Sequence, residues 1–172
     1  EVDETGPRMI EAFRAMSADN KLLLKDFSFR SADIQFNRTL SLNLGGVHVD
    51  IMAAGPAHTD GDIAVLVRED GVLFTGDVVQ QNYAPVLMGA QSSLASWLSQ
   101  IEKLQALPAE AIVPSHSAVT DRKAFDDMRE MLVFVRDRWA GIKAQKLTAK
   151  AAQDRLIADF KARFPDCDNA DL

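Results

Sequence analysis

The sequence has a single cysteine, no long apolar run and fewer basic than acidic residues, and each of these features excludes a class of protein. A single cysteine, Cys167, excludes a disulfide within the chain. No apolar run reaches the roughly 18 residues that a membrane-spanning helix needs, so we expect no membrane contact. The 19 lysines and arginines are outnumbered by 25 aspartates and glutamates, which gives a net charge of -6 and argues against a nucleic-acid partner.

What is present is enough for one folded unit. The chain has 172 residues, of which 47% are hydrophobic, and this length and composition suit a domain with its own core. The sequence contains no internal repeat, linker or low-complexity segment. We therefore predict a single domain over residues 1–172.

Strands are expected in the first half of the chain. The segments TLSLNL (39–44) and VHVDIM (47–52) alternate apolar and polar residues, and Gly45-Gly46 between them predicts a two-residue hairpin. A second strand pair is expected to turn at Asp70-Gly71. We expect the alternating apolar residues of the first pair to face the core: Leu40, Leu42, Leu44, Val47, Val49 and Ile51.

Helical spacing dominates the second half. Residues 94–107 carry apolar side chains three and four positions apart, after a capping serine and before Pro108. Two further helices are predicted from about Asp121 and Thr148. A short helix over residues 6–16 and a buried strand over 111–114 complete the pattern. Hairpins followed by alternating strands and helices indicate an α/β layered fold with a mixed sheet.

Three polar residues stand where a predicted strand gives way to a loop: His58, Asp77 and His116. Ligands of α/β proteins bind at the carboxyl ends of strands, and two imidazoles with a carboxylate suit zinc or a similar divalent metal. A plainer interpretation stays open, in which the histidines are surface residues and Asp77 forms a turn or caps a helix. His48 lies inside a strand on the same face as Asp50, so we expect it to lie away from the other three.

Three segments resemble, in order, the later motifs of the metallo-β-lactamase-fold superfamily: GPAHTDGDIAVLV (55–67), GVLFTGDVV (71–79) and AIVPSHS (111–117). The resemblance extends from about Leu40 to His116. It implies that His58 is a metal ligand, that Asp77 bridges two metals and that His116 is a ligand of the second metal.

The sequence departs from the family pattern in two places. Ser115 and Ser117 stand where the family often has glycines, and the His-x-His-x-Asp-His motif that supplies further ligands upstream is absent. We therefore expect the C-terminal half of the fold. It would be half of an αββα sandwich, with a mixed, mainly antiparallel sheet and helices on its outer face.

The resemblance implies hydrolysis at a dinuclear metal site shared with a missing N-terminal half. The cofactor would be zinc, with two ions in the complete protein, although manganese or iron would accept the same ligands. Catalysis would use a metal-activated water. β-Lactamases of the family carry cysteine or serine where Asp77 stands, so the expected small-molecule substrate is an ester, thioester or lactone, with a β-lactam as an alternative.

Two further expectations concern substrate and partners. Asn82 and Tyr83, in the loop after Asp77, could reach a substrate oxygen, although an ordinary loop asparagine and a half-buried tyrosine explain them as well. A different hypothesis is that the chain is a non-catalytic fragment or assembly module. Half of a split sandwich exposes an apolar sheet face, which would pair with its own N-terminal half or with another copy of the chain.

Overall fold

The structure divides the chain into two compact units. The computed structural model describes residues 5–30 and 32–170, and the units comprise residues 1–35 and 36–172. Residues 1–4, 31 and 171–172, which belong to the domain predicted over residues 1–172, lie outside the description. That domain assignment stays a prediction.

The first unit contains two short helices, α1 (Thr5–Met16) and α2 (Ala18–Leu23). The helix predicted over residues 6–16 is confirmed by α1. Helix α2 begins after Ser17, whose side chain accepts a hydrogen bond from the backbone N–H of Asn20 at 3.0 Å. None of the described side chains of this unit is fully buried.

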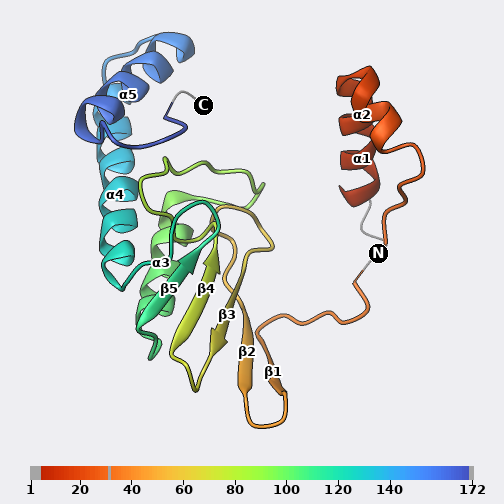
Figure 1. Ribbon diagram of the computed structural model, residues 1–172. Coiled ribbons are helices and arrows are strands. Elements are labelled where there is room, and N and C mark those ends of the chain that lie inside the picture. Colours follow the sequence, from red (N-terminus) through yellow and green to blue (C-terminus); the bar gives the residue numbers. More distant parts are fainter. Residues whose placement is uncertain (1–4, 31, 171–172) are drawn as a thin grey trace. The chain divides into compact units, whose positions relative to one another are not determined.

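The second unit is built on a five-stranded sheet whose strands lie side by side in chain order (Figure 1). Neighbouring strands are antiparallel from β1 to β4, and β5 runs parallel to β4. Both predicted hairpins are present, and the glycines of their turns have positive φ angles. The mixed, mainly antiparallel sheet is thus confirmed. Its strands are β1 (Thr39–Asn43), β2 (His48–Ala53), β3 (Ile63–Val67), β4 (Val72–Gly76) and β5 (Ala111–Pro114).

Three helices accompany the sheet: α3 (Leu94–Gln105), α4 (Lys123–Lys143) and α5 (Ala149–Arg163). Their apolar stripes join β3, β4 and β5 in one core (Figure 1). The largest fully buried side chains include Trp97 and Ile101 of α3 and Phe125, Met128 and Leu132 of α4. Among the described residues, no helix is both long and apolar enough to cross a membrane.

The two faces of the sheet differ in composition. One row across the strands is polar at β1 and β2 and apolar at β3 to β5, where it belongs to the core shared with the helices: Ser41, Asp50, Leu66, Leu73 and Ile112. The other face is apolar on every strand. Its first row contains Leu40, Ile51, Val65, Phe74 and Val113, and its second row contains Leu42, Val49, Val67, Val72 and Ala111.

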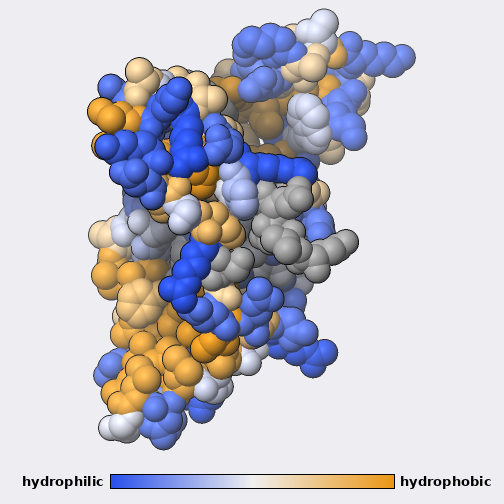
Figure 2. All heavy atoms as spheres, turned by 90° about the vertical axis from the view of Figure 1, so that its right-hand side faces the viewer, coloured by the Kyte–Doolittle hydropathy of each residue, from blue (hydrophilic) through white to orange (hydrophobic). Residues whose placement is uncertain are grey.

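This apolar face, called the open face below, is not covered by the helices. None of its ten side chains in the two rows is buried, and Phe74 is 44% exposed. Figure 2 shows apolar residues gathered at the height of the strands. The expectation that the alternating apolar residues of β1 and β2 face the core was wrong, because the helices pack on the opposite face. Those residues lie on the open face or, like Leu44 and Val47, in an exposed turn.

Candidate metal centre

The turns that follow β2, β4 and β5 leave the sheet at one edge. Gly76 at the end of β4 pairs with Pro114 at the end of β5. A Cβ on Gly76 would lie 3.6 Å from the carbonyl oxygen of Ile63, which begins β3. Gly76 also has a φ of 54°, so glycine allows the turn there. The predicted ligands therefore lie in loops that begin at the same end of the sheet: His58, Asp77 and His116.

Asp77 and His116 come together beyond this edge. Nε2 of His116 lies 3.1 Å from Oδ1 of Asp77, and the two side chains are 50% and 30% exposed, respectively. The same Oδ1 accepts hydrogen bonds from Nε2 of Gln80, at 2.8 Å, and from the hydroxyl of Ser115. A carboxylate and an imidazole thus converge at a place that solvent can reach.

His58 is held by the backbone of the loop that precedes α3. Its Nδ1 lies 2.6 Å from the carbonyl oxygen of Val86. Because a carbonyl only accepts, Nδ1 carries a hydrogen, and Nε2 is the ring nitrogen left to bind a metal. The ring also packs edge-on against Trp97, with centroids 6.0 Å apart. A backbone acceptor on one ring nitrogen is how proteins usually orient a metal-binding histidine.

The turn around His58 depends on close backbone contacts. A Cβ on Gly55 would lie 2.5 Å from the carbonyl oxygen of Asp60, so only glycine fits there. The carboxylate of Asp60 accepts hydrogen bonds from the backbone N–H groups of Ala90 and Gln91, at 3.0 and 2.8 Å. These bonds tie the loop before α3 to the His58 turn.

His48 lies at the opposite end of the sheet, as expected. It begins β2, and its carbonyl accepts a hydrogen bond from the backbone N–H of Arg68 in the turn between β3 and β4. Its Nδ1 is 2.5 Å from Oε1 of Glu69 in the same turn. His48 therefore belongs to a surface pair and not to the metal-site candidates.

The two expected substrate contacts lie in different surroundings. The ring of Tyr83 stacks on His116, with centroids 4.8 Å apart and an interplanar angle of 13°. Asn82, with a φ of 56°, accepts a backbone hydrogen bond from Asp168 and lines a cavity beside α4. Tyr83 is therefore beside the candidate ligands, and contact of either residue with a substrate stays a prediction.

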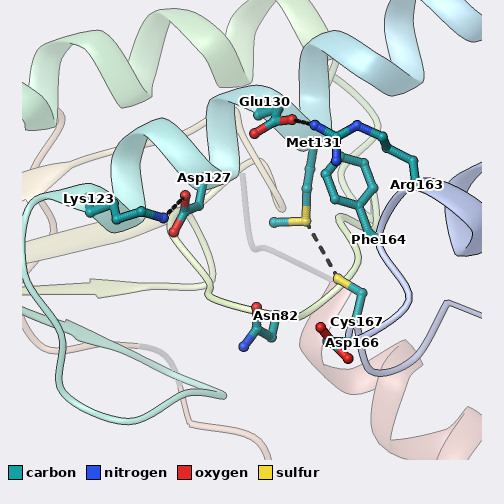
Figure 3. Close-up of a pocket in the computed structure, with 9 residues that line it drawn as sticks. All are labelled: Asn82, Lys123, Asp127, Glu130, Met131, Arg163, Phe164, Asp166 and Cys167. Atoms are coloured by element: carbon teal, nitrogen blue, oxygen red, sulfur yellow. Dashed lines mark hydrogen bonds and ion pairs between the residues drawn. The ribbon is translucent and has the colours of Figure 1, made fainter.

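The cavity lined by Asn82 has a volume of about 200 Å³ and opens between α4 and the end of α5 (Figure 3). Its two basic side chains are already paired, Lys123 with Asp127 and Arg163 with Glu130. Cys167 points its Sγ at the Sδ of Met131, 3.6 Å away. Burial and the nearby charge of Asp168 raise the pKa of the Cys167 thiol, which disfavours the reactive thiolate.

The sequence analysis did not predict three residues that make hydrogen bonds around Asp77 and His116. Gln80 and Ser115 donate to Asp77, and Ser117 bonds to both backbone groups of Gln81. The sequence analysis named Ser115 and Ser117 only because they replace glycines. The signal that could have found them is their position, directly before and after a predicted ligand.

The donor set fits a divalent metal in kind, because imidazole and carboxylate are both common ligands. The number of these ligands is too small for a complete site. Among residues 5–30 and 32–170, no group of three or more His, Cys, Asp or Glu side chains could hold a metal ion. A catalytic zinc has about three protein ligands, so Asp77 and His116 by themselves would not complete such a site. The metal-binding roles of His58, Asp77 and His116 stay predictions.

Known proteins share this sequence pattern and fold. Residues 2–116 match the family described as the metallo-beta-lactamase superfamily. A solved metallo-beta-lactamase from Pontibacter korlensis is 25% identical, with a TM-score of 0.55 over 72% of this chain and 62% of that chain. No curated protein matches the sequence.

Two further structures share the fold. VMB-1 is 23% identical with a TM-score of 0.52, over 68% of this chain and 54% of that one. TMB-1 is 19% identical with a TM-score of 0.52, over 68% of this chain and 55% of that one. Its structure is described in terms of two residues and their role in substrate and inhibitor binding. The chain therefore spans 54% to 62% of the solved proteins to which it is similar.

Proposed function

Because this chain belongs to the metallo-β-lactamase superfamily, we propose that it is part of a metal-dependent hydrolase. The observation that carries the proposal is the contact between Oδ1 of Asp77 and Nε2 of His116, 3.1 Å apart at the ends of β4 and β5. These are the residues that the family resemblance assigns to the metal. His58, with Nε2 free to coordinate, supports the same function.

The proposed cofactor is zinc, two ions in the complete site, with manganese or iron as alternatives. Bound metal would supply an activated water and polarise the acyl oxygen of the substrate. Asp77, His116 and His58 would hold the ions, and ligands outside this chain would complete the site. Tyr83 covers one side of the His116 ring.

The proposed substrate is a small ester, thioester or lactone, and a β-lactam is the alternative within the same chemistry. The aspartate at position 77 supports the first group. The acidic net charge of -6 agrees with a small-molecule substrate and disfavours a nucleic acid. Tyr83 and Asn82, in the loop after Asp77, are the proposed contacts to a substrate oxygen.

The test compares variants of the full-length gene product with the 172-residue chain. Zinc content is measured by mass spectrometry, and hydrolysis is assayed with a nitrophenyl ester and a lactone. We expect the full-length protein to bind about two zinc ions and to hydrolyse at least one substrate. Asp77→Ala should lower kcat/KM by more than about 100-fold, the upper range for residues that only support a ligand.

His48→Ala is the matched control, because it removes an imidazole from the other end of the sheet. It should leave zinc content and turnover unchanged. A full-length protein that binds no zinc, or an Asp77→Ala variant as active as the control, would overturn the proposed function. The chain alone should bind zinc weakly. Tight zinc binding and full turnover by the chain alone would instead show that no outside ligands are needed.

A second candidate function is supported by the open face of the sheet. Ten apolar residues in two rows lie there without cover from the helices. We propose as the alternative that the chain is an assembly module, which pairs through this face with its own N-terminal half or with another copy. Apolar patches of this kind mark interaction surfaces.

A further inference from the structure

The two serines around His116 join the turn after β5 to the loop after β4. The hydroxyl of Ser115 donates to Oδ1 of Asp77. The hydroxyl of Ser117 donates to the carbonyl of Gln81 at 2.7 Å and accepts from the N–H of Gln81 at 2.9 Å. Each side of His116 is therefore fixed to the segment that carries Asp77. Glycines, which the family often has at these two positions, could make none of these side-chain bonds.

Gln80 donates to the same carboxylate. Its side chain is only 2% exposed, and its Nε2 donates to Oδ1 of Asp77 at 2.8 Å. Gln80 and Ser115 thus both donate to one oxygen. Among the described residues, no group donates to Oδ2, so that oxygen keeps its full capacity to accept.

We propose that Ser115 and Ser117 are positioning residues, which hold Asp77 and His116 in place for a metal before the metal binds. This proposal rests on the proposed function. The serine hydroxyls replace the freedom of a glycine turn with fixed contacts, so less conformational entropy is lost when the metal binds. Groups that orient metal ligands typically change metal affinity by about 10- to 100-fold. Stacking of Tyr83 on His116 restrains the imidazole further.

The experiment titrates the full-length gene product with Co²⁺, whose visible absorption reports ligand geometry independently of activity. The variants are Ser115→Ala and Ser117→Ala. We expect Co²⁺ affinity to fall by about 10-fold or more for Ser115→Ala, with a changed absorption spectrum. Ser117→Ala should weaken binding less, because Ser117 contacts the backbone of Gln81 and not a ligand. Ser115→Thr, which keeps the hydroxyl, should restore affinity and spectrum.

Ser41→Ala is the matched control. Ser41 is an exposed serine whose hydroxyl also donates to a carboxylate, that of Asp50, at 2.6 Å. It lies on β1, so its loss should leave Co²⁺ binding unchanged. Urea unfolding of every variant separates lost stability from lost affinity, and Ser115 is exposed, so its hydroxyl can be removed without opening a cavity.

The outcomes distinguish the two proposals. If the natural protein binds Co²⁺ and Ser115→Ala binds it equally well, the positioning role is overturned and the proposed function stands. If Ser115→Thr fails to restore binding, the hydroxyl is not the cause and the positioning role is again overturned. If the natural protein binds no Co²⁺, both proposals are overturned together.

Discussion

Glu69, in the turn after β3, makes two hydrogen bonds to His48 on the neighbouring strand β2. Oε2 accepts from the backbone N–H of His48 at 2.7 Å, and Oε1 meets Nδ1 of the same residue at 2.5 Å. The backbone bond, followed by the ring bond, lowers the pKa of Glu69 from 4.5 to about 2. Since the carboxyl is exposed, solvent screening keeps its contribution to stability small.

The lowered pKa of Glu69 predicts how stability changes in acid. A carboxyl whose pKa is lower in the folded state stabilises the fold above its unfolded pKa of 4.5 and loses that contribution as the pH falls toward about 2. In urea unfolding, the natural chain should therefore exceed Glu69→Gln in stability at pH 5. The difference should shrink as the pH falls from 4.5, the unfolded pKa, to about 2, the folded pKa, where it approaches zero.

His48→Ala is the control for this effect, because it keeps the backbone N–H that contributes most to the lowered pKa. It should retain the larger part of the pH dependence. A stability difference between the natural chain and Glu69→Gln that stays constant over this pH range would contradict the assignment.

The positions of the candidate ligands could be predicted because strand ends are visible in the sequence. The contacts that organise them could not. Whether Ser115 points at Asp77, or Tyr83 lies on His116, depends on side-chain directions that are set only when two distant turns meet. His58 shows the same limit, since its partner Val86 belongs to a loop with no regular pattern.

Helix α3 begins with a reciprocal pair of hydrogen bonds. The hydroxyl of Ser93 accepts from the backbone N–H of Ser96 at 3.1 Å, and the hydroxyl of Ser96 accepts from the N–H of Ser93 at 3.0 Å. Such a capping box satisfies N–H groups that otherwise lack a partner in the first turn. Because α3 carries the buried Trp97, its start also fixes the packing beside His58.

Ser93→Ala should destabilise the protein by about 1 kcal/mol, the usual cost of removing an N-cap side chain. Urea unfolding monitored by circular dichroism measures this cost. Ser99→Ala is the matched control, since Ser99 is an exposed serine inside the same helix. It should be neutral or slightly stabilising, because alanine is the better helix former. Equal losses in the two variants would contradict the role of the cap.

The secondary structure was predictable wherever the period was clear, as in α3, α4 and both hairpins. Helix α2 escaped because its six residues are too few to show a period. Which face of the sheet the helices cover could not be predicted either. Alternation shows which residues share a face, but it does not show which face the helices cover. Only the connections after β4 and β5 decide that.

The open face is an apolar surface through which the chain could associate in solution. Its two rows are apolar from β1 to β5, whereas the row through Ser41 and Asp50 on the helix face is apolar only at β3 to β5. Strands β3 to β5 are therefore apolar on both sides, the composition of a sheet that is covered on both faces. We expect the isolated chain to associate through the open face.

Phe74→Lys tests this association, because Phe74 lies between Val65 and Val113 in its row and is 44% exposed. The charge would lose its water inside an interface, so association should weaken by more than about tenfold. Sedimentation velocity over a range of concentrations measures the change. Leu147→Lys is the control. It replaces an apolar residue that is 43% exposed, between α4 and α5 and away from the sheet.

The natural chain and Leu147→Lys should sediment alike, as associated species, while Phe74→Lys should remain monomeric at the same concentration. A natural chain that stays monomeric throughout, or two variants that behave alike, would show that the open face does not drive association. The full-length gene product separates the two proposed partners. If it is monomeric while the chain alone associates, its own N-terminal half covers the face. If it also associates, and Phe74→Lys abolishes this, the face joins two copies.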